Sequence, residues 1–165
     1  MGVTAWFPVL VAGLMFLVHR QGAAEGQGAA EGEDMTDPRP RGIRNNNPGN
    51  IEFSAANDWQ GQTGSDGRYA VFSDPVWGIR AMGKVLDSYG RRGVDTVAEI
   101  VATWAPESEN PTGNYIATVE ELTGLTAASR ITRADYPALV EAMIYFENGE
   151  QPYSRGLILD GMARI

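Results

Sequence analysis

The sequence predicts an α+β domain that is mostly helical, with one small β-hairpin, preceded by a transmembrane helix and a flexible linker. Three observations lead to this prediction: an uncharged apolar N-terminus, turn signals around two short alternating segments, and helical periodicity beyond residue 74. We divide the chain into an anchor at 1–20, a linker at 21–38 and a domain at 39–165.

The N-terminal segment Met1–Val18 has no charged side chain and is almost wholly apolar from Val3 onward. As a helix it would extend about 27 Å, which is close to the thickness of the hydrocarbon core of a bilayer. A cleavable signal peptide is the alternative, but the basic n-region that it requires is missing. We therefore expect an uncleaved anchor, followed by a solvated linker in which QGAAEG occurs twice.

Composition narrows the chemistry that the chain can perform. There is no cysteine, and the one histidine, His19, sits beside the apolar run, so disulfides, thiolate zinc sites and His-based triads are excluded from the domain. A formal net charge of −8 argues against a nucleic-acid partner. No metal or organic cofactor is implied, which leaves carboxylates as the reactive groups.

The first part of the domain favours turns and short strands. The run Asn45–Gly49 is a dense turn signal. Short apolar–polar alternations at Asn50–Phe53 and Tyr69–Phe72 predict two strands, with Asp66-Gly67 as the turn chemistry between them.

Helices are expected beyond this hairpin. Asp74 before Pro75 predicts a helix start, with the end at Gly90, and Thr96 with Glu99 forms a capping box for a second helix. Pro106 ends that second helix. A third helix is expected to begin at Asn110-Pro111 and to end before Gly124, with Tyr115, Ile116 and Val119 facing inward at helical spacing. A fourth is expected to begin at Asp135 and to end at Asn148-Gly149.

One glutamate lies on the apolar face of the last predicted helix. The stripe of Tyr136, Leu139, Val140, Met143 and Ile144 continues at Glu147. Desolvation there, together with the C-terminal end of the helix dipole, would raise the pKa of the carboxyl and keep it protonated, as a general acid requires. The alternative is a helix-end glutamate that leans into solvent and pairs with an arginine such as Arg155, while Glu141 faces solvent in either case.

The segment LVEAMIYFENGEQPYS resembles the catalytic segment of lytic transglycosylases and related lysozyme-like muramidases. Glu147, Gly149, Pro152 and Ser154 match that pattern over about sixteen residues, whereas Asn148 stands where the family usually has serine. The resemblance implies that the single glutamate protonates the glycosidic oxygen and then acts as the base that closes a 1,6-anhydro product. It also adds Tyr153 to the residues expected to contact the glycan.

A second resemblance covers RGIRNNNPGNI at 41–51, Trp59-x-Gly61, Asp66 and YAVF at 69–72. This pattern, with WAPESENPTGNYIATV at 104–119, is similar to phage and prophage virion proteins that are described as structural or muralytic. It also loosely resembles a glucosaminidase pattern. Because the catalytic helix follows these elements here, the two resemblances together imply a lysozyme-like domain that is circularly permuted.

Further residues are weighed as parts of the same site. Asp66 and Glu109 are predicted as additional acids of the cleft. The alternative for Asp66 is an ordinary turn residue, and the alternative for Glu109 is a residue that caps a helix. Trp59, in a polar loop, is the expected sugar platform, since Trp104 follows helical periodicity and belongs to the core. Three asparagines are predicted to bind N-acetyl groups, although such residues commonly hold their own turn together: Asn46, Asn47 and Asn50.

These inferences predict a virion-associated, membrane-tethered enzyme that cleaves the MurNAc–GlcNAc β-1,4 bond of peptidoglycan and aids phage genome entry. The expected partners are bacterial peptidoglycan, the membrane and other virion proteins. Two alternatives stay open: a non-catalytic structural or glycan-binding virion protein, and a prophage protein in the bacterial inner membrane with its domain in the periplasm.

Overall fold

The computed structural model describes residues 37–106 and 112–165. This part of the chain is mostly helical, with one small antiparallel sheet. The predicted anchor at 1–20 and all but the last two residues of the linker lie outside the described residues. Within the described part, no helix is long and apolar enough to cross a membrane. The elements in chain order are α1 (Arg41–Arg44), β1 (Gln62–Ser65), β2 (Ala70–Phe72), α2 (Pro75–Arg91), α3 (Val97–Trp104), α4 (Thr112–Thr123), α5 (Tyr136–Asn148) and α6 (Arg155–Ala163).

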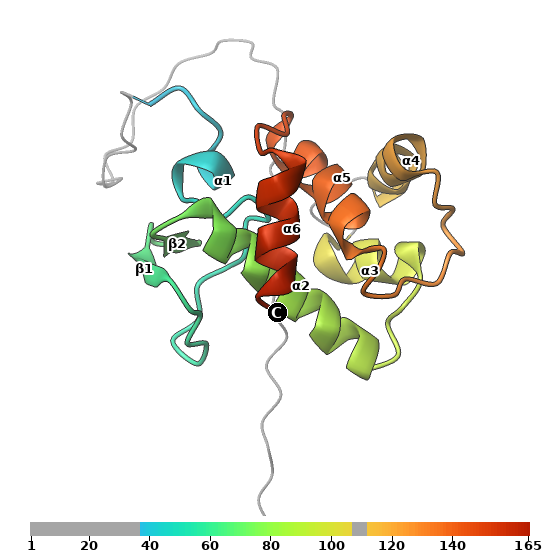
Figure 1. Cartoon of the computed structure of the whole chain (residues 1–165), viewed down its shortest axis with the longest axis horizontal. Coiled ribbons are helices and arrows are strands. Elements are labelled where there is room, and N and C mark those ends of the chain that lie inside the picture. Colours follow the sequence, from blue (N-terminus) through green and yellow to red (C-terminus); the bar gives the residue numbers. More distant parts are fainter. Residues whose placement is uncertain (1–36, 107–111) are drawn as a thin grey trace, which may run out of the picture.

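The helices are arranged around α2 and α5 (Figure 1). The small α1 and the hairpin lie on one side, α3 and α4 lie on the other, and α6 packs across α2 and α5. The last residues of α3 and the first turn of α4 therefore reach the same region as the end of α5. This region is the junction of segments that are far apart in the sequence.

Three of the predicted helix signals are found in place, whereas Asp135 makes no side-chain capping bond to α5, α2 ends at Arg91 one residue beyond Gly90, and the start predicted at Asn110-Pro111 lies outside the described residues. Asp74 caps α2 by accepting from the backbone N–H of Val76 at 2.9 Å, and both hydrogen bonds of the capping box of Thr96 and Glu99 are present at the start of α3. Gly149 ends α5 in the left-handed conformation with φ 72°, which a glycine adopts without steric cost.

The hairpin differs from the prediction at its first strand. Residues 50–53 were expected to pair with 69–72, but the strand that pairs with β2 is β1, across the turn at Asp66-Gly67. The polar segment Gln62–Ser65 has little apolar alternation, and its closeness to the turn decides the pairing. The predicted segment 50–53 still runs antiparallel to the residues around the start of β2, through an isolated bridge from Glu52 to Tyr69 and hydrogen bonds from Ala70 N–H to the carbonyl of Ile51 and from Phe53 N–H to the carbonyl of Arg68.

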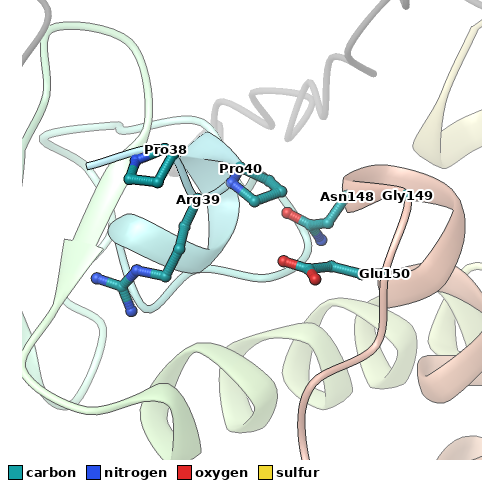
Figure 2. Close-up of a pocket in the computed structure, with 6 residues that line it drawn as sticks. All are labelled: Pro38, Arg39, Pro40, Asn148, Gly149 and Glu150. Atoms are coloured by element: carbon teal, nitrogen blue, oxygen red, sulfur yellow. The ribbon is translucent and has the colours of Figure 1, made fainter. Parts of the chain in front are cut away.

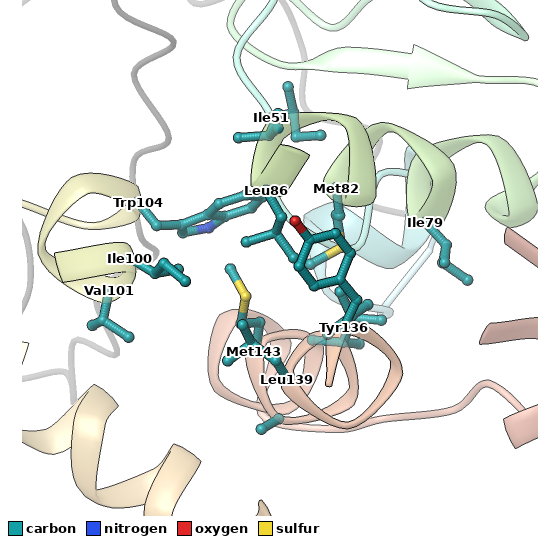
Figure 3. Close-up of a cluster of buried hydrophobic side chains, with 14 of the residues drawn as sticks. Ile51, Ile79, Met82, Leu86, Ile100, Val101, Trp104, Tyr136, Leu139 and Met143 are labelled. Carbon is teal, nitrogen blue, oxygen red and sulfur yellow. The ribbon is translucent and has the colours of Figure 1, made fainter. Parts of the chain in front are cut away.

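The hydrophobic core lies between α2, α3 and α5 (Figure 3). Leu86 and Met82 of α2 meet Leu139 and Met143 of α5, and Trp104 closes this cluster at the end of α3. The core thus places the Trp104 indole beside the C-terminal half of α5, where the candidate site begins.

Candidate functional site

Glu147 is buried at the C-terminal end of α5, with 3% of its surface exposed. The residues before it on the same face, Met143 and Ile144, are fully buried, so the apolar stripe of the helix carries this carboxyl into the interior. The expected arginine, Arg155, pairs instead with Glu141 at 2.7 Å on the outer face of the helix. The prediction that Glu147 faces the core and Glu141 faces outward is confirmed.

Three neutral side chains from three other segments donate hydrogen bonds to the Glu147 carboxyl. The indole Nε1 of Trp104 and the hydroxyl of Tyr115 both donate to Oε1 at 3.2 Å, and Nδ2 of Asn50 donates to Oε2 at 3.2 Å. No donor among these is a cation. The carboxyl therefore joins the turn before the hairpin, the end of α3 and the start of α4 to the end of α5.

Each donor is held by its own element. Trp104 is the last residue of α3 and packs edge-on against Tyr89 with ring centroids 6.4 Å apart. Tyr115 lies in the first turn of α4 and stacks on Phe146, with centroids 3.9 Å apart. Both rings are thus fixed by aromatic packing, and their polar atoms point at one carboxylate oxygen.

The turn at residues 45–50 places the third donor. Asn47 is fully buried, and its side chain donates to the carbonyls of Ile51 and Ala70 and accepts from the N–H of Ile51. Asn50 adopts a left-handed conformation with φ 47°, which asparagine tolerates better than most residues. The side chain of Asn47 is used within the turn, and the side chain of Asn50 faces Glu147.

Burial dominates the electrostatics of this carboxyl. Desolvation raises the pKa of Glu147 from its ordinary 4.5 to about 7, against the hydrogen bonds from Asn50, Tyr115 and Trp104, which lower it. Burial likewise raises the pKa of the Tyr115 hydroxyl well above its usual range, and the neighbouring Glu147 adds to that effect. Glu147 is thereby poised to gain or lose its proton near neutral pH.

The hydrogen-bond count favours Oε2 as the oxygen that carries the proton. Oε1 accepts from two donors, which fills both of its acceptor positions, whereas Oε2 accepts only from Asn50 among the described residues. A proton on Oε2 therefore disturbs no existing hydrogen bond. Chemically, such a group can act as a general acid and, once ionised, as a general base.

An open pocket of about 400 Å³ adjoins the end of α5. Figure 2 shows it between Pro38–Pro40, which precede α1, and the Asn148–Glu150 turn. At the edge of this pocket the side chain of Asn148 is held in place, because its Nδ2 donates to the carbonyls of Pro48 at 2.8 Å and Ile144 at 2.9 Å. A Cβ at Gly42 would lie 2.5 Å from Oδ1 of Asn148, so the absence of a side chain at 42 permits this close approach.

Asp66 lies in the hairpin turn and not beside Glu147. It accepts from Nε of Arg41 at 2.6 Å, from Nδ2 of Asn45 at 2.5 Å and from the backbone N–H groups of Arg68 and Tyr69. Partial burial works to raise the pKa of Asp66, but these hydrogen bonds outweigh it and hold the pKa below its usual range. An ionised carboxyl held this way anchors the turn to α1.

The structure describes three more of the predicted site residues: Asn46, Trp59 and Tyr153. Asn46 donates to the carbonyl of Phe72 at 2.9 Å, and Trp59 is partly buried against the core with its Nε1 without a partner among the described residues. Tyr153 is also partly buried, and burial raises the pKa of its hydroxyl to about 12. Glu109 lies outside the described residues.

Sequence reasoning placed Tyr115 and Trp104 in the core but missed their polar role. The inward position of both followed from helical spacing, and both are fully buried. A buried indole N–H and a buried phenol each need an acceptor, which could have linked them to the one carboxyl on a core-facing stripe. Among the described residues, no group of acidic side chains and histidine could hold a metal ion.

No family model matches the chain. The chain is 40% identical over 126 residues to "Protein P5" of Pseudoalteromonas phage PM2. The aligned region covers 73% of this chain and 79% of that protein. The similarity thus extends over most of both chains.

Proposed function

The chain belongs to the family of protein P5 of Pseudoalteromonas phage PM2, and from this premise we propose that it is a virion-associated enzyme that cleaves peptidoglycan glycan strands. The proposed bond is the β-1,4 glycosidic bond between MurNAc and GlcNAc, and Glu147 is the proposed general acid. A lysozyme-like arrangement of the domain, in circularly permuted order, is part of the same proposal.

One observation carries this proposal: a buried carboxyl with a pKa of about 7 whose hydrogen-bond donors, within residues 37–106 and 112–165, are all neutral. A buried carboxylate with a purely structural role is commonly paired with a cation, which lowers its pKa. Here burial dominates and raises the pKa of Glu147 to about 7, so that both protonation states are accessible near neutral pH. That balance suits a group that must first donate and then accept a proton.

The proposed reaction uses Glu147 twice. The protonated Oε2 gives its proton to the glycosidic oxygen as the bond between that oxygen and C1 breaks, leaving oxocarbenium-like charge on the sugar. The Glu147 carboxylate then takes the proton from the C6 hydroxyl of the same sugar as that oxygen bonds to C1. The products are a 1,6-anhydro end and a free hydroxyl, and the carboxyl is protonated again.

The predicted anchor and linker complete this proposal. A linker of this composition would have a root-mean-square reach of roughly 20–25 Å, which would keep the domain near a membrane surface. We place the enzyme in the virion because its relative is a phage protein. Glycan cleavage from that position would open a path through the cell wall for genome entry.

The test compares the full-length wild-type chain with Glu147→Gln in release of soluble fragments from purified peptidoglycan, over pH 4 to 9. We expect Glu147→Gln to lose at least about 100-fold in rate, the usual contribution of general acid catalysis. Glu141→Gln is the matched control, since Glu141 lies on the outer face of the same helix and should leave the rate unchanged. Asp66→Asn should retain most of the rate, because Asp66 anchors the hairpin turn and does not lie beside Glu147.

Mass analysis of the fragments separates two outcomes of cleavage, since 1,6-anhydro ends indicate a transglycosylase and reducing ends a hydrolase. Equal rates for wild type and Glu147→Gln would exclude Glu147 as the acid.

A non-catalytic glycan-binding or structural virion protein is the second candidate. The observation in its favour is the burial of Glu147, which is 3% exposed while it joins four segments of the chain. This candidate predicts that wild type releases no fragments at any pH and still sediments with peptidoglycan.

A further inference from the structure

We propose that Asn50 is a positioning residue that orients Oε2 of Glu147 for proton transfer. The inference rests on the proposed function, because it concerns the acid of that reaction. Asn50 is 97 residues from Glu147 in the sequence, and its side chain is buried against the end of α5.

Asn50 makes two contacts with Glu147. Its Nδ2 donates to Oε2 of Glu147 at 3.2 Å and lies 3.5 Å from the backbone carbonyl of Glu147. Among the described residues, Asn50 is the donor to Oε2, whereas Oε1 has two donors. Removing Asn50 therefore frees the oxygen to which we assign the transferred proton.

The surrounding turn is built to deliver this side chain. The side chain of Asn47 accepts from the N–H of Ile51 and donates to the carbonyl of Ala70, which fixes the chain next to Asn50. Asn50 itself takes the left-handed conformation that turns its side chain toward α5. Gly42 provides the space, because a Cβ there would lie 2.8 Å from Oδ1 of Asn50. A surface loop that only reversed the chain would not require a buried amide aimed at a carboxyl.

The titratable groups facing Glu147 are phenols. Tyr115 comes from α4 and Tyr69 precedes β2, and interaction with Glu147 helps to raise the pKa of each, with burial as the main cause. Tyr89 of α2 in turn faces Tyr115. These phenols remain neutral between pH 5 and 8, so within the described part of the chain a titration in that range at this site reports Glu147.

The experiment uses the full-length chain and a matched pair of variants. Asn46 and Asn50 both have positive φ, so glycine relieves the backbone at either position, but only Asn50 contacts Glu147. We follow the Glu147 carboxyl by 13C NMR as a function of pH, assigned from the signal that Glu147→Gln lacks. Asn50→Gly should raise its pKa by about one unit, a tenfold change in proton affinity, while Asn46→Gly leaves it unchanged.

Activity supplies the second measurement. Asn50→Gly should move the pH profile of peptidoglycan cleavage upward by the same amount and lower kcat about tenfold with little change in KM. An unchanged pKa of Glu147 in Asn50→Gly overturns the inference. If wild type cleaves nothing, the proposed function fails, while the NMR titration still decides the role of Asn50.

Asn50→Asp covers the case in which Asn50→Gly does not fold. Aspartate tolerates the left-handed conformation and places a second carboxyl against Oε2. Two adjacent carboxyls share a proton, so the pKa of Glu147 should rise further. A pKa that stays the same or falls in this variant also overturns the inference.

Discussion

At the scale of single residues, Glu147 holds a proton in the folded chain at pH values where the unfolded chain has already released it. Its pKa is about 7 when buried, compared with an ordinary value of 4.5. Between these two values the folded state binds more protons than the unfolded state, so the free energy of unfolding falls as pH rises. The same burial that prepares the acid thus destabilises the fold once the acid ionises.

We therefore predict that the wild-type chain loses on the order of 3 kcal/mol of folding stability between pH 4.5 and 8, from the difference of the two pKa values. Urea unfolding at a series of pH values measures this loss. Glu147→Gln carries no titrating group at this position and should show a much flatter profile over the same range. Parallel profiles for the two proteins would contradict the assigned pKa.

Asp66 acts in the opposite direction at lower pH. Its pKa is depressed in the folded chain, so the stability it contributes is present above its ordinary value of 3.8 and is lost as pH falls below it. The combined contribution of these two carboxyls is therefore greatest near pH 4, between 3.8, below which the contribution of Asp66 is lost, and 4.5, above which burial of Glu147 lowers stability.

At the scale of elements, the turn that carries Asn50 rests directly on α2. A Cβ added at Gly78 would lie 2.1 Å from the backbone carbonyl oxygen of Asn46 and 2.9 Å from Cδ of Pro48. Backbone atoms cannot move away as a flexible side chain can. The contact between α2 and this turn therefore depends on a glycine at 78.

Gly78→Ala should destabilise the chain by about 1–3 kcal/mol through this overlap. Gly90→Ala in the same helix is the control, because nothing lies within 4 Å of its added Cβ, and it should be neutral or stabilising by up to about 1 kcal/mol. Urea unfolding at one pH compares the two. Equal effects would mean that helix propensity, and not the contact with the turn, governs both positions.

The elements that the sequence predicted well are those with local signals. The caps of α2 and α3 and the glycine that ends α5 are read from a few neighbouring residues, and each is found in place. The first strand of the hairpin was predicted in the wrong place, because its pairing depends on the turn and not on its own pattern. The last helix, α6, was missed, although Ser154 caps it by accepting from the N–H of Leu157.

At the scale of the whole molecule, the candidate site is assembled from four segments that the sequence keeps far apart. Helical periodicity identified Glu147, because the apolar stripe that points to it lies within a single helix. The donors Asn50, Trp104 and Tyr115 come from other elements, and their convergence depends on how α3, α4 and the turn pack on α5. Such contacts follow from tertiary packing, which no local pattern specifies.

The predicted anchor leads to a prediction for the full chain. The predicted anchor at 1–20 should bind the chain to lipid vesicles, and each arginine placed at the centre of its apolar run should disfavour insertion by roughly 2.5–3.5 kcal/mol. We expect the wild-type chain to float with vesicles in a density gradient and a variant with Val11→Arg and Leu14→Arg to stay at the bottom. Gln21→Arg, outside the apolar run, is the control and should float like wild type.

The same variants separate attachment from catalysis. With isolated peptidoglycan, which carries no membrane, Val11→Arg with Leu14→Arg should cleave at the wild-type rate, because Glu147 and its three donors all lie beyond residue 37. Flotation of the double variant, or absence of wild-type flotation, would contradict the anchor. If the double variant lost both flotation and cleavage, the N-terminal segment would also be needed for the folded domain. Loss of membrane attachment alone leaves the Glu147 carboxyl and its donors unchanged.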